Sequence, residues 1–120
     1  MIYAFICRDA GDQTERRSAL LLEHLRYIET VIDHIVVAGP CPPTAAGDTR
    51  QFQGSMMLYR AESMTEAKAL FDGDPYARNG IWSSVDVMPF EAVAVAYVGG
   101  TTWDIVDGKF TKRARPEAPR

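Results

Sequence analysis

Short apolar runs alternate with segments of helical periodicity along this chain, and their order restricts the fold more than any other feature. Residues of high β-propensity fill four runs, and segments with apolar residues three or four apart separate the first run from the second and the third from the fourth. The sequence therefore predicts the order strand, helix, strand, strand, helix, strand. The four predicted strands cover residues 2–7, 34–39, 52–61 and 81–88.

The first helical segment carries a start signal at its N-terminal end. Asp12 is followed three residues later by Glu15, which is the spacing of a capping box. We therefore expect this helix to begin near Gln13 and to end near residue 32 or 33. Prolines and glycine between residues 40 and 50 predict a loop after the second strand.

The second helical segment has start and stop signals of its own. Ser63 with Glu66 repeats the capping-box spacing, and Gly73 fits the position just after the end of this helix. Asp74 and Pro75 follow. Because proline suits the first helical position behind an aspartate N-cap, we expect one short helical turn through residue 78.

This order predicts an α+β fold of the ferredoxin-like type, with an antiparallel sheet and both helices on one face. The other face would be bare, and a second copy of the subunit is its simplest cover, so we expect a homodimer. Residues 92–98 and 101–106 predict one or two extra strands that cover a sheet edge or cross to a partner subunit. We thus expect a single domain over residues 1–110, with a C-terminal strand extension from about residue 91, and a flexible basic tail over residues 111–120.

Composition limits the classes of partner and the compartment. The chain has 120 residues, 47% hydrophobic and 24% charged, which is the balance of one soluble globular domain. Its net charge of -3 argues against nucleic acid as a partner, because phosphate binding needs a basic face. The uncharged run over residues 92–103 is too short to cross a membrane, and no signal peptide is visible. We therefore expect a cytoplasmic protein in which Cys7 and Cys41 are reduced.

His24 is the most informative single residue, because it lies within the apolar face of the first helix. At about 100° per residue the apolar side chains fall on one broad arc, and His24 falls inside it between Ile28 and Val31. An imidazole there is partly desolvated and needs a hydrogen-bond partner. It fits either a pocket base under a small ligand or a core histidine satisfied by the backbone or a carboxylate, and helix geometry alone favours the second. The arc comprises Leu20, Leu21, Leu25, Tyr27, Ile28, Val31, Ile32 and Ile35.

Asp74 is the second candidate. Its simplest role is the N-cap of the short turn that begins at Pro75. Because both helices are expected on one face of the sheet, Asp74 can also meet His24. The two roles are compatible, since one carboxylate oxygen can cap the turn while the other meets the imidazole. A carboxylate on one ring nitrogen fixes the tautomer and raises the basicity of the other nitrogen, which is the arrangement of a general base.

No other group of residues matches a known catalytic arrangement. The sequence contains no Gly-x-Ser-x-Gly, P-loop or dinucleotide-binding pattern. It also offers no second metal ligand three or four residues from His24, so we expect neither a metal nor a cofactor. Tyr76 fits a pocket wall or the core. The arginines Arg8, Arg16 and Arg78 either meet an anionic substrate or are simply solvated.

Residues 1–29, MIYAFICRDAGDQTERRSALLLEHLRYIE, resemble the start of the YCII (YciI-like) family. The matching positions are an aspartate at position 9, an arginine at position 16, and the HL-x-Y pattern of His24, Leu25 and Tyr27. Further matches follow in the same order and spacing, so the resemblance covers roughly residues 1–90. They are Ala38-Gly39-Pro40, Gly54-Ser55, Asp74-Pro75-Tyr76, Gly80 and Pro89.

The resemblance implies a dimeric ferredoxin-like protein, an α+β barrel related to muconolactone isomerase. It also implies that His24 and Asp74 form the active site, and beside this pair we expect Arg8, Ser55 and Tyr76 to bind substrate. Some members of the family resemble dehydrochlorinases or lyases that act on chlorinated ring compounds. The implied ligand is therefore a small molecule.

The chain departs from the family pattern just before the histidine. Many members have a basic residue and a proline there, whereas this chain has Leu21 and Leu22. The predicted pocket is more apolar as a result. The chain is also longer beyond Pro89 than the minimal domain, so the role of that extension is not implied by the resemblance.

These residues lead to three hypotheses. In the first, the protein is a small-molecule lyase or isomerase, similar to a dehydrochlorinase, in which His24 removes a proton from carbon and Asp74 orients it without a cofactor. In the second, it is a non-catalytic dimeric module that binds a metabolite in the same pocket. In the third, it is a structural dimer whose His24 is buried and fully satisfied. The ligand must be small, because a domain of this size offers a pocket of only a few hundred Å³.

Overall fold

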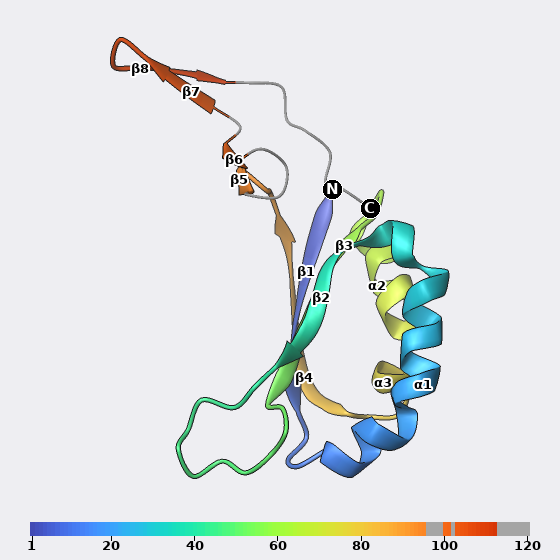
Figure 1. The fold of residues 1–120 in the computed structure, drawn as a ribbon. Helices are drawn as coiled ribbons and strands as arrows, with labels where there is room; N and C mark the ends of the chain where they lie inside the picture. The colour runs from blue at the N-terminus through green and yellow to red at the C-terminus, as the bar shows by residue number, and fades with distance from the viewer. Residues whose placement is uncertain (96–99, 102, 113–120) are drawn as a thin grey trace. The chain divides into compact units, whose positions relative to one another are not determined.

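The computed structural model of the protein describes residues 1–95, 100–101 and 103–112 (Figure 1). The chain divides into two compact units, Met1–Phe90 and Glu91–Arg120. The first unit contains the predicted α+β fold and every candidate site residue.

The first unit is built on a four-stranded antiparallel sheet. The strand order is β2-β3-β1-β4, so the central strand β1 pairs with both β3 and β4. This order confirms the predicted ferredoxin-like arrangement. The strands are β1 (Ile2–Asp9), β2 (Ile35–Cys41), β3 (Gly54–Arg60) and β4 (Trp82–Phe90).

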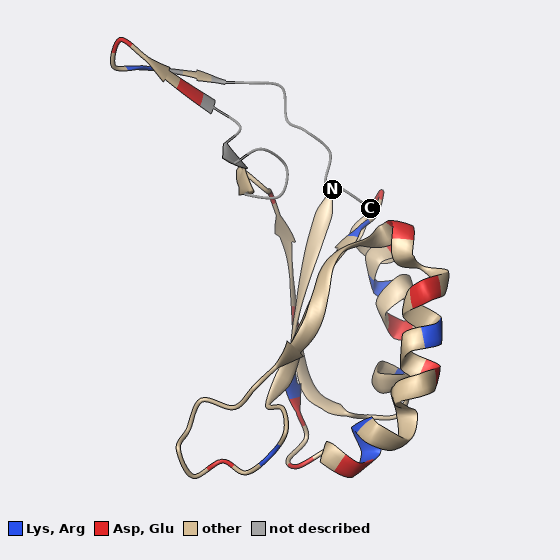
Figure 2. Cartoon of the chain, viewed as in Figure 1, with Lys and Arg blue, Asp and Glu red and all other residues tan. Residues whose placement is uncertain are grey.

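The helices of this unit all cover one face of the sheet, as predicted (Figure 1). They are α1 (Thr14–Thr30), α2 (Met64–Asp72) and α3 (Pro75–Arg78), and the 3-10 turn η1 (Ile32–His34) leads from α1 into β2. Charged side chains are spread along the helices, whereas the strands of the sheet carry few of them (Figure 2). The helices thus present a solvated outer side and an apolar inner side.

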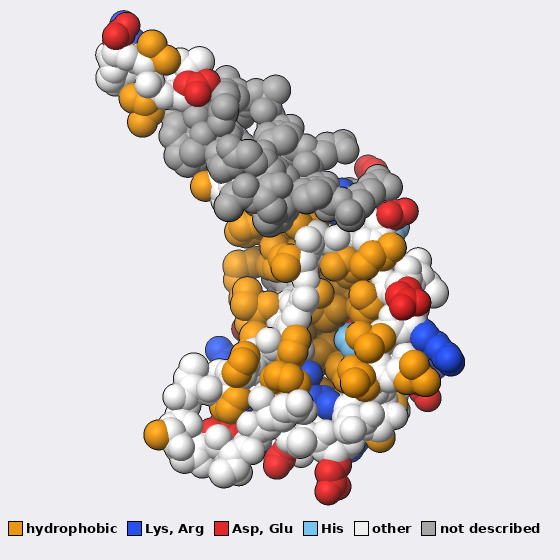
Figure 3. Space-filling view, viewed as in Figure 1, with side chains coloured by type: hydrophobic (Ala, Val, Ile, Leu, Met, Phe, Trp, Pro, Cys, Tyr) orange, Lys and Arg blue, Asp and Glu red, His pale blue; other side chains and the backbone are white. Residues whose placement is uncertain are grey.

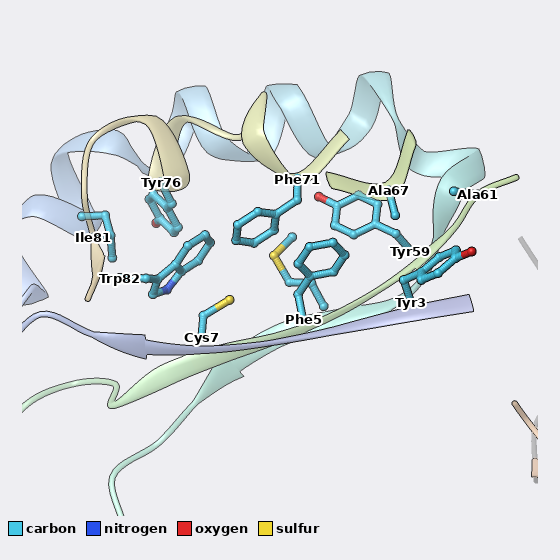
Figure 4. Close-up of a cluster of buried hydrophobic side chains, with 11 residues drawn as sticks. Tyr3, Phe5, Cys7, Tyr59, Ala61, Ala67, Phe71, Tyr76, Ile81 and Trp82 are labelled. Carbon is cyan, nitrogen blue, oxygen red and sulfur yellow. The ribbon is translucent and has the colours of Figure 1, made fainter. Parts of the chain in front are cut away.

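The core lies between the helices and the sheet (Figure 4). Alternate residues of a strand face opposite sides, so Tyr3, Phe5 and Cys7 of β1 all point toward the helices. The Phe5 ring stacks on Phe71 of α2, with ring centroids 4.5 Å apart. The buried cluster comprises Tyr3, Phe5, Cys7, Met57, Tyr59, Ala61, Ala67, Phe71, Tyr76, Ile81 and Trp82.

Some boundaries differ from the prediction for identifiable reasons. Strand β2 continues through Pro40 and β4 through Pro89. Both strands lie at the edges of the sheet, where the missing N–H of proline is tolerated. The expected capping box does not form, because Gln13 is the N-cap of α1 and Asp12 lies one residue too early. Asp12 instead accepts a hydrogen bond of 3.0 Å from the N–H of Thr14.

The described residues of the second unit include two short antiparallel strand pairs. Strand β5 (Ala94–Val95) pairs with β6 (Gly100–Thr101), and β7 (Trp103–Val106) pairs with β8 (Lys109–Lys112). The turn between β7 and β8 places Asp107 and Gly108 at φ 51° and 72°, which matches a hairpin turn of type I′. The predicted extra strands and tail are thus partly described: β8 includes residues 111–112, whereas residues 96–98 and 113–120 lie outside the described residues.

Candidate active site

His24 lies on the side of α1 that faces the sheet, and its side chain is 16% exposed. Its Nδ1 atom lies 2.7 Å from Oδ1 of Asp74, a residue 50 positions further along the chain. An ionised carboxylate can only accept hydrogen bonds, so Nδ1–H donates to it. The other ring nitrogen, Nε2, then carries the lone pair and can accept a proton.

Asp74 is fully buried and is the N-cap of α3. Its Oδ1 accepts a 2.9 Å hydrogen bond from the N–H of Tyr76 as well as the bond from His24. The same oxygen therefore caps α3 and binds the imidazole, whereas the sequence analysis expected one oxygen for the cap and the other for the imidazole. Oδ2 has no hydrogen-bond partner among the described residues. The cap thus holds the carboxylate in place beneath the imidazole.

Tyr76 supports the imidazole from its flat side. The two rings are stacked, with centroids 4.0 Å apart and planes 3° from parallel. Burial raises the pKa of the Tyr76 hydroxyl, so this group remains protonated and donates a 3.0 Å hydrogen bond to the carbonyl of Arg17. The ring of His24 is therefore fixed by Asp74 at one edge and by Tyr76 on one face.

Arg17 forms a second buried ion pair beside the first. Its guanidinium donates two hydrogen bonds to the carboxylate of Asp9, of 2.8 and 2.7 Å. Nη2 also donates to the carbonyl of Gly54 at 3.1 Å and to Oγ of Ser55 at 3.0 Å. These hydrogen bonds hold the positive charge of Arg17 at one end of the site, where β1 and β3 provide the acceptors.

A cavity of about 210 Å³ opens beside these groups. In Figure 3, hydrophobic side chains surround histidine and cationic atoms in the hollow between α1 and the sheet. The polar side chains in its wall are those of Arg17, His24, Ser55 and Tyr76, and the rest of the wall is largely apolar. The lining residues are Arg17, Leu21, His24, Leu25, Ile28, Ala38, Gly39, Pro40, Phe52, Ser55, Met57 and Tyr76.

The structure brings together four of the five residues selected from the sequence. His24, Ser55 and Tyr76 line the cavity, and Asp74 binds His24 from below. Arg8 is not in this group. Because Cys7 points toward the helices, its neighbour in β1 projects from the opposite face of the sheet, where Arg8 is exposed.

Sequence reasoning missed Arg17 and considered its neighbour Arg16 only as a residue that either meets an anionic substrate or is solvated. Arg16 is exposed, and its guanidinium donates to Gln13 and to the carbonyl of Asn79 instead. The missed signal was periodicity. Arg17 precedes His24 by seven residues, which is almost two full turns, so both fall on one face of a helix. In β1 the odd-numbered residues point toward the helices. Asp9 continues this alternation, so the sequence also predicts that Asp9 faces the helices.

Among the described residues, no three His, Cys, Asp or Glu side chains lie where they could jointly hold a metal ion. The same part of the chain contains no helix with the length and apolarity needed to span a membrane. The side chains that line the cavity supply a base, a fixed cation and two hydroxyl groups.

The YCII-related domain family matches residues 1–91. The chain belongs to the YCII family. Protein YciI of Escherichia coli is 32% identical to this YCII chain over 97 aligned residues, and the match covers 78% of this chain and 99% of the relative. An uncharacterized protein of Haemophilus influenzae is 30% identical over 101 residues, with the same coverage of both chains.

A solved structure with a similar fold is 5-chloro-2-hydroxyhydroquinone dehydrochlorinase (TftG) from Burkholderia phenoliruptrix AC1100, in complex with 2,5-dihydroxybenzoquinone. Its TM-score to this YCII chain is 0.67 at 25% sequence identity. The match covers 76% of this chain and 94% of the dehydrochlorinase. The fold resemblance therefore extends over nearly the whole of that enzyme.

Proposed function

We propose that this YCII protein is a cofactor-independent lyase or isomerase for a small ring compound, with His24 as the general base. The observation that carries the proposal is the 2.7 Å contact between His24 Nδ1 and Asp74 Oδ1, which leaves Nε2 as a proton acceptor in the wall of a cavity. The likeness to a dehydrochlorinase supports a reaction that begins with proton removal. Proton transfer of this kind needs only a correctly oriented base.

In the proposed step, a ring substrate such as 5-chloro-2-hydroxyhydroquinone reacts as its diketo tautomer, in which the carbon that loses a proton and the adjacent carbon that carries chlorine are both tetrahedral. Nε2 of His24 takes the proton from the first of these carbons. The electron pair of the broken C–H bond forms a C=C bond. In a lyase, chloride leaves from the adjacent carbon with its bonding pair. In an isomerase, the histidine returns the proton to another carbon. Asp74 stabilises the imidazolium that exists between these events, because its carboxylate is already in contact with Nδ1.

The test uses 5-chloro-2-hydroxyhydroquinone as substrate and measures chloride release. We expect turnover by the natural chain. His24→Gln should lower kcat by about 10²–10⁴-fold, the usual contribution of general-base catalysis. The matched control is His34→Gln. His34 is hydrogen-bonded to the carbonyl of Arg60 and is not one of the residues that line the cavity. Equal rates for the His24 variant and the natural chain would contradict the mechanism.

The same assay separates catalysis from simple binding. Saturable binding of the substrate with no chloride or isomer formed over hours would favour the metabolite-binding module instead. The fully enclosed histidine of the third hypothesis has less support, since His24 contributes to the wall of a cavity.

We also propose that the chain forms a homodimer through the open face of its sheet. Several large apolar side chains on the strands are exposed there, on the side away from the helices. Val37 of β2 is 52% exposed, Met56 of β3 46% and Met88 of β4 49%. In the sheet register, Met56 of β3 pairs with Ile6 of β1, and Met88 of β4 pairs with Ala4 of β1. Because Ile6 and Ala4 lie on the same face of β1, these side chains form one continuous apolar patch. Contiguous patches of this kind are usually covered in solution.

Light scattering coupled to size-exclusion chromatography tests the dimer. We expect a dimeric mass for the natural chain and a monomeric mass for Met56→Glu, because a charge at the centre of an apolar interface is costly to desolvate. Leu22→Glu is the matched control, since Leu22 is 61% exposed on α1, on the other side of the sheet. A monomeric natural chain would contradict the proposal.

A cytoplasmic location is proposed on chemical grounds. Cys7 and Cys41 are both free cysteines. Reducing compartments keep such thiols unpaired, so their presence supports this location.

A further inference from the structure

We infer that Arg17 is the anion-binding residue of the cavity, and that the cavity takes a single planar ring with an ionised oxygen, such as an enolate, a phenolate or a ring carboxylate. The inference rests on the proposed function, since it concerns the same site. It adds the chemical class of the ligand and the orientation in which the ligand binds.

The first argument is the state of the Arg17 guanidinium. The side chain is buried, with 4% of the residue exposed, yet it lies in the cavity wall. A guanidinium has five N–H donors. Asp9, Gly54 and Ser55 accept bonds from Nε and Nη2, whereas Nη1 has no hydrogen-bond partner among the described residues. Nη1 is not among the buried unpartnered atoms of the described residues, so it keeps contact with solvent in the cavity wall, where an anionic ligand can accept its hydrogen bonds.

Ser55 adds a second donor at the same end. Its Oγ accepts a bond from Nη2 of Arg17 at 3.0 Å, so its own O–H proton remains available. Ser55 is 6% exposed and also lines the cavity. A cation and a neutral hydroxyl therefore converge on one point of the wall, as is expected for a site that binds one oxyanion.

The remaining charges set the orientation of the ligand. The carboxylate of Asp74 lies at the His24 end, and that of Asp9 is already engaged by Arg17. An anionic oxygen is repelled at the His24 end and attracted at the Arg17 end. The acidic C–H of the ligand then faces His24, where the base is.

The distances and the volume indicate a single ring. Arg17 Cζ lies 5.3 Å from the centroid of the Tyr76 ring, and the His24 ring is stacked on that same tyrosine. The anion site and the base thus lie within reach of one substituted ring. A cavity of about 150 Å³ can hold benzene, so about 210 Å³ fits one ring with a few substituents. Leu21, Leu25 and Met57 provide an apolar wall for the ring.

Isothermal titration calorimetry with two probes tests the assignment. The anionic probe is 2,5-dihydroxybenzoquinone at pH 7.5, and the neutral probe is its dimethyl ether, which cannot ionise. Arg17→Gln should weaken binding of the anion by about 10- to 100-fold, the value of a hydrogen bond to a charged group, and should change binding of the ether by less than about threefold. Arg16→Gln is the matched control, because it removes the same charge from the exposed neighbour and should change neither affinity.

Two further variants keep the test decisive. If Arg17→Gln fails to fold because Asp9 is left unpaired, the double variant Asp9→Asn with Arg17→Gln removes both charges and should show the same selective loss of anion binding. Asp9→Asn alone should strengthen binding of the anion, since it removes the negative charge that offsets Arg17. Equal losses for both probes, or unchanged anion binding without Arg17, would overturn the inference.

Failure of this inference is distinguishable from failure of the proposed function. His24→Gln should stop chloride release while changing the affinity for the anion by less than about threefold. If that variant loses turnover but Arg17→Gln binds the anion normally, the base is correct and the anion site is wrong. If Arg17→Gln shows the selective loss but His24→Gln still turns over, the anion site is correct and the base is wrong.

Discussion

Asp74 carries two functions on a single oxygen atom, and substitution can separate them. Asp74→Asn retains an oxygen for the α3 cap, and asparagine caps as well as aspartate, so we expect little change in the free energy of unfolding. Asp74→Ala removes the cap and should lower that free energy by about 1–2 kcal/mol. Both variants lose the charge that orients His24, so both should lose turnover. Urea unfolding beside the chloride assay measures the two effects, and retained turnover in the asparagine variant would contradict the orienting role.

Cys7 gives a second prediction at the residue scale. Burial, with a smaller contribution from the charge of Asp74, raises the pKa of its thiol from 9.0 to about 12. The thiolate is the reactive form, so Cys7 should resist iodoacetamide at pH 8 while the half-buried Cys41 is labelled. Mass spectrometry after digestion identifies the labelled residue, and labelling in urea provides the control. Labelling of Cys7 in the folded chain at a rate like that of Cys41 would contradict this burial.

The same pKa predicts how stability depends on pH. The folded state holds the thiol proton more tightly than the unfolded state does, so the stabilisation is fully present below about pH 9. It is lost as the pH rises toward 12, because the unfolded thiol ionises first. Cys7→Ser should flatten this part of the curve, and an unchanged slope of unfolding free energy between pH 9 and 11 would be the contrary result.

Single residues differed in how well the sequence predicted them. His24 stood out because a polar ring within an apolar arc is conspicuous, and the contact with Asp74 followed from the expected fold. Arg17 did not stand out, because an arginine at the start of a helix normally indicates a solvated side chain. Arg8 was selected as a cation near the site, but a strand alternates its faces at every residue. A shift of one position therefore moves a side chain from the cavity to the opposite face.

At the scale of elements, the end of α2 depends on a close approach between helices. Gly73 has φ -75°, a conformation that alanine also adopts, so backbone freedom does not explain the glycine. A Cβ atom there would contact the hydroxyl and ring of Tyr27, whose hydroxyl donates to the carbonyl of Leu70. The glycine is thus required by the packing of α1 against α2, where the sequence indicated only a helix stop.

This packing predicts the effect of Gly73→Ala. Displacing Tyr27 costs its hydrogen bond and part of its packing, so we expect the free energy of unfolding to fall by about 1–2 kcal/mol. In a Tyr27→Leu background the same change should be neutral or stabilising, because alanine restricts the unfolded chain. Gly47→Ala is the matched control, since its Cβ would meet nothing within 4 Å. Thermal or urea unfolding measures all four variants, and additive effects would exclude the contact as the cause.

Element types were predicted better than element ends. The two main helices and four strands follow from periodicity, which depends on many residues at once. Their ends depend on one or two hydrogen bonds. The last turn of the first predicted helix is the 3-10 turn η1, so α1 itself stops at Thr30. The sequence predicted that the second and fourth strands end before Pro40 and Pro89. A proline in an edge strand breaks no hydrogen bond between strands. Which strands lie at the edges depends on the order of strands in the sheet, and that order is a tertiary property.

At the scale of the whole molecule, the sequence predicts the first unit and its cavity but not the relation of that unit to the rest of the chain. Among the described residues, the buried cluster and the lining of the His24 cavity lie within residues 3–82, and the YCII match ends at residue 91. The second unit has short strand pairs and exposed apolar side chains, such as Ile105 at 70%. Two-stranded hairpins of this size are marginally stable in water by themselves.

These facts predict that the chain tolerates truncation after Phe90. Among the described residues, the hydrogen-bond partners of Asp74, Arg17 and His24 and the lining of their cavity all lie within the first unit, so the truncated chain should fold and bind 2,5-dihydroxybenzoquinone with unchanged affinity by calorimetry. A peptide of residues 91–120 should show the circular dichroism of an unfolded chain, because two-stranded pairs as short as the described ones are marginally stable by themselves. Loss of ligand binding by a truncated chain that still folds would instead assign the extension to the site. The cavity could then no longer be assigned to residues 1–90 alone, because that assignment requires that the first unit binds the ligand by itself.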